Sequence, residues 1–416
     1  MAATETGVWG LQDVRDKQLA SEWTYDGARE LYSLGPGSYG ATGQNLTTPQ
    51  GAYSSTKQVG TDTNWKQADT SSNGASGGTK TDGTLWIWGS NSAGRLGLNQ
   101  KAPGAGPGFI PGISSPTQIP GTNWNQIAMN ANTTVASKTD GTIWGWGQNY
   151  GQLGLNQPQS GPGYNRSSPT QMGADDSDWS IAFNTGTGTA YAVKTSGQLW
   201  AWGDNQYGEQ AANDRTSRSS PTQVGTDTTW STNINNWGPS DGHSMFAIKT
   251  DGTLWTWGYE DFGSLGLNNK GVSQSSPVQI PGTTWKMIST CDSTNGAVKT
   301  DGTLWIWGNN AQGQLAQNNL TQRSSPVQIP GTTWNYIHCG YGAFSAIKTD
   351  GTMWMWGSNY RGLLGLNSPD INYSSPVQLP GTTWKMTDSG NLGYTLALKT
   401  DGTMWGWGHN DKGVLD

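Results

Sequence analysis

The stretch Lys299–Gly308 reads K-T-D-G-T-L-W-I-W-G, and near-copies of it recur along the chain of 416 residues. An Asp-Gly pair between two extended runs is typical of a β-hairpin, and a two-residue connection predicts a type I′ turn, since both residues tolerate positive φ. The arm from Leu304 to Trp307 is apolar at every position, so it must be covered on both faces. Seven copies begin at Lys80, Lys138, Lys194, Lys249, Lys299, Lys348 and Lys399.

Each copy belongs to a longer repeat. After W-x-W-G comes a glycine-rich segment, then an S-S-P-V-Q-I run such as Ser324–Ile329, then a T-x-W element that ends at Trp334. Proline cannot donate to a strand ladder, so the S-S-P-V-Q-I run belongs on an edge strand. Successive W-x-W-G pairs lie 49 to 58 residues apart, which is the length of a four-stranded propeller blade. The sequence therefore predicts an all-β fold, a seven-bladed β-propeller of four-stranded blades.

The segment Trp146–Gly154 reads W-G-Q-N-Y-G-Q-L-G, and S-S-P and D-G-x-x-x-x-W-G follow it. This pattern resembles the regulator of chromosome condensation repeat. The resemblance runs from about Leu31 to the C-terminus and implies a seven-bladed propeller. It also implies protein partners, since members of that family act on chromatin or on small GTPases, and a propeller-type β-lactamase inhibitory protein grips an enzyme with its rim loops.

The positions of the tryptophans and the charge composition narrow the functions that the chain could have. Of the 24 tryptophans, 14 lie in W-x-W-G pairs and seven in T-x-W elements, which leaves Trp9, Trp23 and Trp237 outside the repeat. Tryptophan is therefore expected mainly in the core. Charged residues make up 12% of the chain, the net charge is -6, and there is no basic run. Nucleic acid or membrane-surface binding is disfavoured, because it depends on clustered lysine and arginine.

We divide the chain into an N-terminal attachment segment, residues 1–30, and the propeller, residues 31–416. Apolar residues near helical spacing predict a short helical or extended segment that either packs on the propeller or docks the chain onto a larger assembly. Gly7–Leu11, G-V-W-G-L, is similar to a short N-terminal motif of tailed-phage structural proteins. We expect neither a signal peptide nor a membrane-spanning helix. The expected attachment residues are Trp9, Leu11, Val14, Leu19 and Trp23.

Leu31–Gly35, L-Y-S-L-G, stands at the W-x-W-G position but has lost both tryptophans. Seven complete sets of strands lie between Ser54 and Gly408, so this degenerate copy either lies outside the ring or helps the termini to close. An eight-bladed ring with one incomplete blade is the alternative.

Insertions point to a binding surface. Gln100–Ile113 and Gln157–Arg166 are inserted at the same point of two repeats, and we expect them on one face of the ring, which in repeat proteins is often the binding face. A third insertion adds the region around Trp237, which is either a loop packed on its own blade or a contact anchor. The expected partner contacts are Phe109, Ile110, Tyr164 and Trp237.

No catalytic chemistry is predicted. His243, His338 and His409 have no spacing typical of metal ligands, and the glycine-rich segments lack the helix and Lys-Ser/Thr ending of a phosphate cradle. We therefore expect no enzyme activity, no metal and no cofactor. For Cys291 and Cys339 we favour two free buried thiols, with a cross-blade disulfide as the alternative.

The leading hypothesis is a non-enzymatic bacteriophage virion protein, made in the host cytoplasm: a capsid decoration, a fibre or a tail-associated adhesion module. It would bind other virion proteins or a host surface receptor. The alternative is a bacterial soluble protein-binding propeller similar to the β-lactamase inhibitory type. A third possibility, nucleotide exchange on a small GTPase, rests on the family name alone.

Overall fold

The structure is a computed structural model. It describes residues 29–35, 41–45, 53–71, 74–99, 112–130, 132–157, 164–173, 176–239, 243–291, 293–368, 370–390 and 393–409. The five expected attachment residues, Trp9, Leu11, Val14, Leu19 and Trp23, lie outside these ranges, as do Phe109 and Ile110. Within the described ranges, no helix has the length and apolar character needed to cross a membrane.

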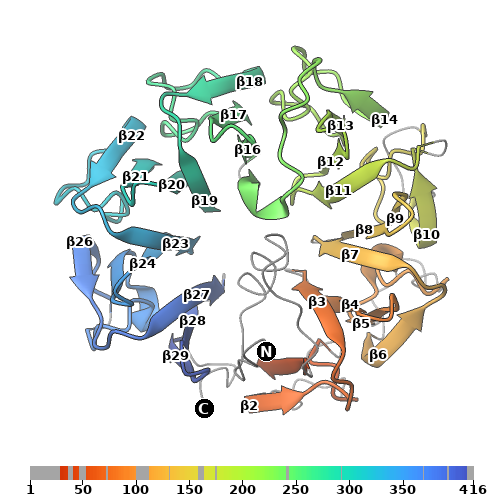
Figure 1. Ribbon diagram of the computed structural model, residues 1–416, viewed down its shortest axis with the longest axis horizontal. Helices are drawn as coiled ribbons and strands as arrows, with labels where there is room; N and C mark the ends of the chain where they lie inside the picture. Colours follow the sequence, from red (N-terminus) through yellow and green to blue (C-terminus); the bar gives the residue numbers. More distant parts are fainter. Residues whose placement is uncertain are drawn as a thin grey trace, which may run out of the picture.

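Antiparallel sheets stand side by side around a central axis (Figure 1). In each blade the chain runs from the innermost strand to the outermost. The innermost strand begins at the T-x-W tryptophan in every blade but the fourth, and the outermost strand of each four-stranded blade carries the S-S-P element. Six of the blades have four strands. They are β3 (Trp65–Thr70), β4 (Ala75–Lys80), β5 (Leu85–Gly89) and β6 (Ile113–Ile119); β7 (Trp124–Met129), β8 (Thr133–Lys138), β9 (Ile143–Gly147) and β10 (Arg166–Met172); β11 (Trp179–Asn184), β12 (Thr189–Lys194), β13 (Leu199–Gly203) and β14 (Arg218–Gln223); β15 (Trp237–Pro239), β16 (Ser244–Ile248), β17 (Leu254–Gly258) and β18 (Gln274–Ile280); β19 (Trp285–Cys291), β20 (Thr294–Lys299), β21 (Leu304–Gly308) and β22 (Arg323–Ile329); and β23 (Trp334–Gly340), β24 (Ala343–Lys348), β25 (Met353–Gly357) and β26 (Tyr373–Gln378).

The seventh blade has three described strands, β27 (Trp384–Gly390), β28 (Tyr394–Lys399) and β29 (Met404–Gly408). The degenerate copy forms β1 (Tyr32–Gly35), which pairs with β2 (Tyr53–Gln58) in a two-stranded sheet. This sheet lies between the last and first blades (Figure 1). The predicted all-β, seven-bladed propeller is confirmed, and the degenerate copy occupies the sector where the ring closes.

The Asp-Gly hairpin is present, but its predicted type I′ turn is wrong. Lys299 N–H donates to the Thr303 carbonyl at 2.9 Å, and Gly302 N–H donates to the Lys299 carbonyl at 3.0 Å. Gly302 has φ +77°, whereas Asp301 is not among the described residues with positive φ. The loop therefore has three residues, a type I turn followed by a glycine bulge. The turn is reinforced by Asp301 Oδ1, which accepts from Thr303 Oγ1 at 2.7 Å, while that hydroxyl accepts from Trp305 Nε1 at 3.0 Å.

The lysine of the repeat lies over two tryptophan rings in all seven units. Lys249 Nζ, for example, is 3.7 Å from the ring centroid of Trp255 and 4.4 Å from that of Trp230. An ammonium group over the faces of two indoles is held by cation–π attraction. The sequence showed the lysine and both tryptophans but not that they meet. The seven lysines are Lys80, Lys138, Lys194, Lys249, Lys299, Lys348 and Lys399.

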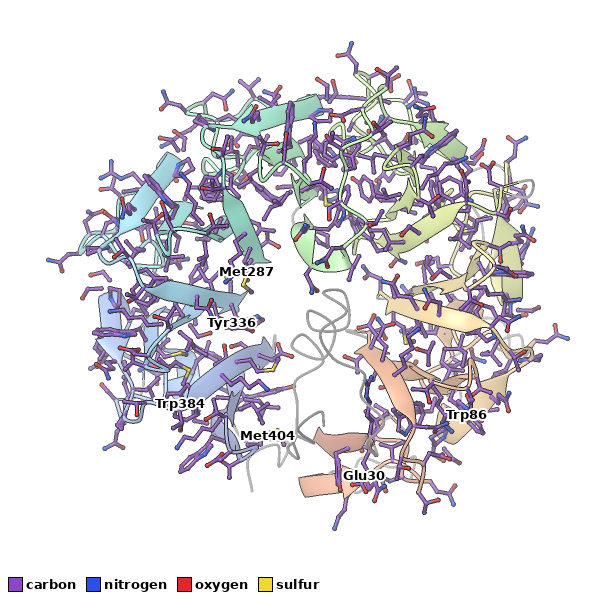
Figure 2. All side chains as sticks on the ribbon, viewed as in Figure 1. Glu30, Trp86, Met287, Tyr336, Trp384 and Met404 are labelled. Atoms are coloured by element: carbon purple, nitrogen blue, oxygen red, sulfur yellow. A yellow bond between two sulfur atoms is a disulfide. The ribbon has the colours of Figure 1, made fainter. Side chains whose placement is uncertain are left out.

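The second tryptophan of each W-x-W-G pair joins neighbouring units. Trp307 Nε1, fully buried, donates at 2.8 Å to the Ser264 carbonyl in the loop of the preceding blade. Trp88 Nε1 donates in the same way to the Ala41 carbonyl at 3.0 Å. The segment after β1 therefore contacts the first blade as each later loop contacts the blade that follows it. Side chains fill the space between neighbouring sheets, and Trp86 and Trp384 lie on opposite sides of the ring (Figure 2). The remaining pairs are Trp146–Arg95, Trp202–Gln152, Trp257–Glu209, Trp356–Gln314 and Trp407–Leu363.

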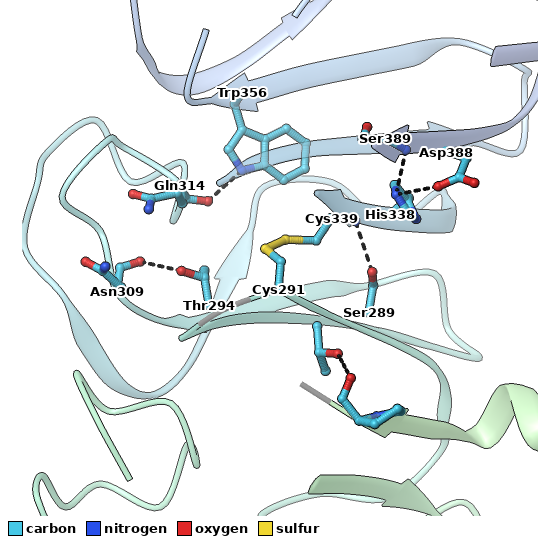
Figure 3. Close-up of a disulfide and its surroundings, with 12 residues drawn as sticks. Ser289, Cys291, Thr294, Asn309, Gln314, His338, Cys339, Trp356, Asp388 and Ser389 are labelled. Atoms are coloured by element: carbon cyan, nitrogen blue, oxygen red, sulfur yellow. Dashed lines mark hydrogen bonds and ion pairs between the residues drawn. A yellow bond between two sulfur atoms is a disulfide. The ribbon is translucent and has the colours of Figure 1, made fainter. Parts of the chain in front are cut away.

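Cys291 on β19 and Cys339 on β23 form a disulfide between adjacent blades, so the expectation of two free thiols is wrong (Figure 3). The two cysteines stand one residue apart in the repeat on neighbouring inner strands, and their Cα atoms lie 5.7 Å apart, within the range for a disulfide. The backbone N–H of Cys339 also donates to Ser289 Oγ at 3.0 Å. Both links tie the inner strands of the fifth and sixth blades.

Candidate partner-binding face

One face of the ring carries two kinds of loop from every unit. The turn between the first and second strands lies beside the loop that follows W-x-W-G. In the second blade, for example, the Gln148 N–H donates to the Asn132 carbonyl at 2.9 Å. We call this side the loop face, and the side with the Asp-Gly hairpins the hairpin face. The insertions predicted from the sequence connect β5 to β6 and β9 to β10, and both connections start on the loop face.

Tyr164 lies at the end of the second insertion, where the chain enters β10. Its side chain is half-buried. Its carbonyl accepts from Arg166 Nη1 at 3.2 Å, and Arg166 Nη2 donates to Gln157 Oε1 at 2.5 Å. The arginine thus holds together the two ends of the insertion. Tyr164 remains a candidate contact at the base of that loop.

Trp237 lies in the core, which is the packing alternative left open by the sequence. It begins β15 and is 5% exposed. Its Nε1 donates to the Ser231 carbonyl at 2.9 Å, and its ring centroid is 5.3 Å from that of Phe183 and 5.9 Å from that of Trp230. Trp230 keeps its place in the repeat, since Lys249 lies 4.4 Å from its ring centroid. Trp237 pairs with Ala247, as Ile288 pairs with Ala297 in the next blade, so it fills the place of an inner-strand core residue. A residue buried in this way cannot anchor a partner, so we remove it from the candidate surface.

Two tyrosines and a histidine cluster where the third and fourth blades meet on the loop face. The ring centroid of Tyr207 lies 4.5 Å from that of Tyr259 and 5.0 Å from that of His243. All three side chains are partly exposed. We call these residues, together with Glu209, the tyrosine cluster.

Glu209 is the buried member of the cluster and holds Tyr207 and His243 together. Its side chain is 3% exposed, one carboxylate oxygen accepts from the Tyr207 N–H at 2.7 Å, and the other lies 2.7 Å from His243 Nδ1. His243 has φ +68°, a strained conformation for a residue with a side chain. In the preceding blade a neutral side chain, Gln152, accepts the corresponding N–H of Tyr150 at 2.5 Å. The carboxylate of Glu209 is therefore particular to the third blade, and it orients the His243 ring against the Tyr207 ring.

Further aromatic side chains are exposed on the same face. Tyr341 and Tyr360 are 43% and 42% exposed, with ring centroids 5.7 Å apart, and the Arg361 guanidinium lies 5.1 Å from the Tyr360 centroid. Tyr150 and Phe262 are 49% and 44% exposed. Five of the aromatics on this face fall within five residues after a W-x-W-G glycine, a recurrence that is visible in the sequence but is absent from the predicted contacts. They are Tyr150, Tyr207, Tyr259, Phe262 and Tyr360.

A small polar cavity of about 130 Å³ opens beside Tyr150, between the second and third blades. Its walls are amides and hydroxyls, which bond mainly to one another: Gln152 Nε2 donates to Thr133 Oγ1 at 3.1 Å, and Gln148 Nε2 donates to Tyr150 Oη at 2.7 Å. These bonds stiffen the surface around Tyr150.

The buried titratable groups of the inner strands join blades. Asp69 accepts from the Met129 N–H of the next blade at 2.7 Å, and burial raises the pKa of Asp69 to about 6. His338 Nε2 accepts from the Ser389 N–H at 3.0 Å (Figure 3), and burial lowers the pKa of His338 against the opposing effect of Asp388. Both groups are engaged in structural bonds. Within the described residues, no three His, Cys, Asp or Glu side chains are grouped to hold a metal ion.

Family models support the repeat assignment. The model of the regulator of chromosome condensation (RCC1) repeat matches residues 251–294, 301–347 and 350–389, and a second model of this repeat matches residues 124–152.

Three relatives align with about a third of the chain. The RCC1 domain-containing protein RUG3, mitochondrial, of Arabidopsis thaliana is 28% identical over 124 residues, 30% of this chain and 25% of that protein. The X-linked retinitis pigmentosa GTPase regulator of Mus musculus is 28% identical over 144 residues, 34% of this chain and 13% of that protein. The E3 ubiquitin-protein ligase HERC2 of Homo sapiens is 30% identical over 132 residues, 30% of this chain and 2% of that protein. The chain thus spans a quarter or less of the length of these relatives.

Solved structures share the whole fold. Prp20p from Saccharomyces cerevisiae, whose structure was described with its binding to Gsp1p and histones, has a TM-score of 0.64 at 14% identity and covers 90% of both chains. Human WBSCR16 has a TM-score of 0.61 at 19% identity and covers 80% of this chain and 86% of its own. At these identities the likeness shows the fold alone. Together with the family models, it shows that the chain contains RCC1 repeats arranged in a seven-bladed β-propeller.

Proposed function

We propose that this chain is a non-enzymatic protein-binding propeller that holds its partner on the loop face. The observation that carries the proposal is the tyrosine cluster, in which the partly exposed ring of Tyr207 packs against the rings of Tyr259 and His243. Glu209 bonds the Tyr207 backbone N–H and the His243 ring, and so orders the cluster. Tyrosine is enriched at protein interfaces, because one rigid side chain offers both apolar area and a hydroxyl. Rings that are already ordered lose little entropy on binding.

The surroundings of the cluster favour a protein over a charged ligand. Tyr150, Phe262, Tyr341 and Tyr360 extend the exposed aromatic surface around the same face. Only 12% of the chain is charged and its net charge is -6, so long-range attraction to a polyanion is weak. We expect an association that depends little on ionic strength.

The setting we propose for this binding is a bacteriophage virion, where the propeller is a decoration, fibre or tail-associated module. The support is the G-V-W-G-L run at Gly7–Leu11, together with the low charge. The relatives named above come from eukaryotes, so the virion setting depends on these sequence features. The alternative is a soluble bacterial protein-binding propeller of the β-lactamase inhibitory type.

Photo-crosslinking tests the proposed face. A photoreactive phenylalanine analogue replaces Tyr207 in one variant and Thr300, exposed on the hairpin face, in a matched control. Each chain is produced during infection, and particles are purified and examined by mass spectrometry. We expect the chain in the particles, with a crosslinked virion protein at position 207 and none at 300. Crosslinks only at 300 would overturn the assignment of the loop face. Absence from the particles would overturn the virion setting.

A further inference from the structure

A pocket of about 480 Å³ lies between the third and fourth blades, lined on one side by the end of the loop that follows W-x-W-G and on the other by Asp227 and Lys249. Its apolar lining comes from Ala211, Ala212, Val224, Trp230, Trp255 and Pro277. The volume is within the range of about 300–1,000 Å³ usual for ligand pockets.

The pocket results from one residue of the repeat. After W-x-W-G, the loop of each unit crosses to the next blade, and Asn213 N–H donates to the Ser275 carbonyl at 2.6 Å as Asn268 N–H donates to the Ser324 carbonyl at 2.6 Å. The two asparagines also share a left-handed backbone, with φ of +61° and +59°. The residue before the asparagine is therefore structurally equivalent in the two units, and it is Ala212 in one and Leu267 in the other.

In the other units a leucine usually stands at this position. Leu98, Leu267 and Leu366 each pack against a hydrophobic cluster that contains the T-x-W tryptophan of the following blade. These tryptophans are Trp124, Trp285 and Trp384, the equivalents of Trp230. Ala212 has a single methyl group in place of the isobutyl group. The faces of Trp230 and Trp255 are accordingly left beside an open space.

The charged groups around the pocket are already paired. Lys249 Nζ lies over both indole rings and forms an ion pair with Asp227, and Arg218 forms an ion pair with Asp214. No net charge is presented to an occupant by these pairs, and removing them from water to bind an ion would be costly. An uncharged aliphatic group suits the walls.

We infer that this pocket receives an aliphatic side chain, leucine in type, from a partner protein. That side chain takes the place that the chain's own leucine takes in the equivalent position of the other units. The pocket shares no lining residue with the tyrosine cluster, and the inference rests on the proposed function only in that the partner is a protein.

A small probe and a matched pair of variants test the inference. Indole resonances of ¹⁵N-tryptophan-labelled protein are followed by NMR during titration with N-acetyl-leucine methylamide. We expect saturable shifts of the Trp230 and Trp255 signals, and no shift with N-acetyl-glycine methylamide. Ala212→Leu fills the pocket with the repeat's own residue, so it should weaken probe binding at least tenfold. Leu267→Ala should create a second site and shift the Trp305 signal.

The outcomes separate the pocket from the loop face. Unchanged probe binding in Ala212→Leu, or no response at Trp230 and Trp255 in the wild type, would overturn the inference. Tighter binding of N-acetyl-tryptophan methylamide would overturn the aliphatic assignment. If Ala212→Leu does not fold, the Leu267→Ala arm decides alone, since the same cavity made elsewhere must bind the same probe. Crosslinking at position 207 is unaffected by any of these results.

Discussion

The tryptophan bonds between blades predict a difference between two substitutions that look alike. Trp202 and Trp307 are both fully buried and both donate at 2.8 Å to a carbonyl of the preceding blade. Trp202 is the one donor to the Gln152 carbonyl among the described residues. The Ser264 carbonyl has a second donor, Asn295 Nδ2, at 2.9 Å. Replacing each tryptophan with phenylalanine therefore removes similar apolar volume but leaves an unpaired buried carbonyl in only one case.

The magnitudes follow from that difference. Loss of part of the indole and the small cavity left behind should cost each variant about 1–2 kcal/mol. The unpaired Gln152 carbonyl should add about 1–3 kcal/mol in Trp202→Phe. Trp307→Phe should then be the milder variant, and Asn295→Ala should remove its advantage by leaving the Ser264 carbonyl without its second donor.

Urea unfolding followed by far-ultraviolet circular dichroism measures these free energies, and the two tryptophan variants are compared with and without Asn295→Ala. Equal losses in Trp202→Phe and Trp307→Phe, unchanged by Asn295→Ala, would refute the reasoning. Such a result would mean that hydrogen bonding to the loop carbonyl contributes nothing beyond packing of the ring.

Three further predictions concern the repeat lysine, the disulfide and a buried carboxyl. Lys299→Met keeps the aliphatic stem but loses attraction to Trp285 and Trp305, so urea unfolding should show a loss of about 1–2 kcal/mol, while Thr300→Ala should show almost none. Cys339→Ser removes a crosslink between residues 48 apart in sequence and should lower the free energy of unfolding by about 2–4 kcal/mol. A reducing agent should lower the free energy of unfolding of the wild type to that of the variant. A wild type whose stability does not respond to reduction would count against the disulfide. Because the pKa of Asp69 is raised to about 6 in the folded state, the native protein binds the extra proton, and stability should fall as pH rises from about 4 to about 6. Asp69→Asn should remove that part of the pH dependence in melting experiments, and an identical pH profile would contradict it.

Much of the fold could be predicted because one repeat carries the signal seven times. The apolar arm Leu304–Trp307 predicted a strand covered on both faces, and the proline of S-S-P predicted an edge strand. Both predictions are confirmed, since β21 is largely buried and β22 ends its sheet. The turn type was missed, because Asp-Gly fits both a two-residue loop and the observed three-residue loop, and only the bond from Lys299 N–H to the Thr303 carbonyl distinguishes them. The disulfide was missed because it depends on how far apart two inner strands lie, which spacing in the sequence does not state.

The candidate site was less predictable. Trp237 stood outside the repeat and so looked like a contact, but the insertion before it moved it onto the inner strand and into the core. The tyrosine cluster joins residues of two blades, Tyr207 and Glu209 from one with Tyr259 and His243 from the next. No local sequence pattern indicates that these residues of two blades contact one another. The recurrence of aromatics after W-x-W-G was the available clue, and it indicated the face without giving the geometry.

The measurement that tests the central claim most directly is the affinity of the crosslinked partner for three purified proteins, determined by isothermal titration calorimetry. They are the wild type, the double variant Tyr207→Ala and Tyr259→Ala, and the hairpin-face control Thr300→Ala. We predict that the double variant, still folded by circular dichroism, binds at least 30-fold more weakly, about 2 kcal/mol, while the control binds like the wild type. Unchanged affinity in the double variant together with a loss in Thr300→Ala would contradict binding through the loop face.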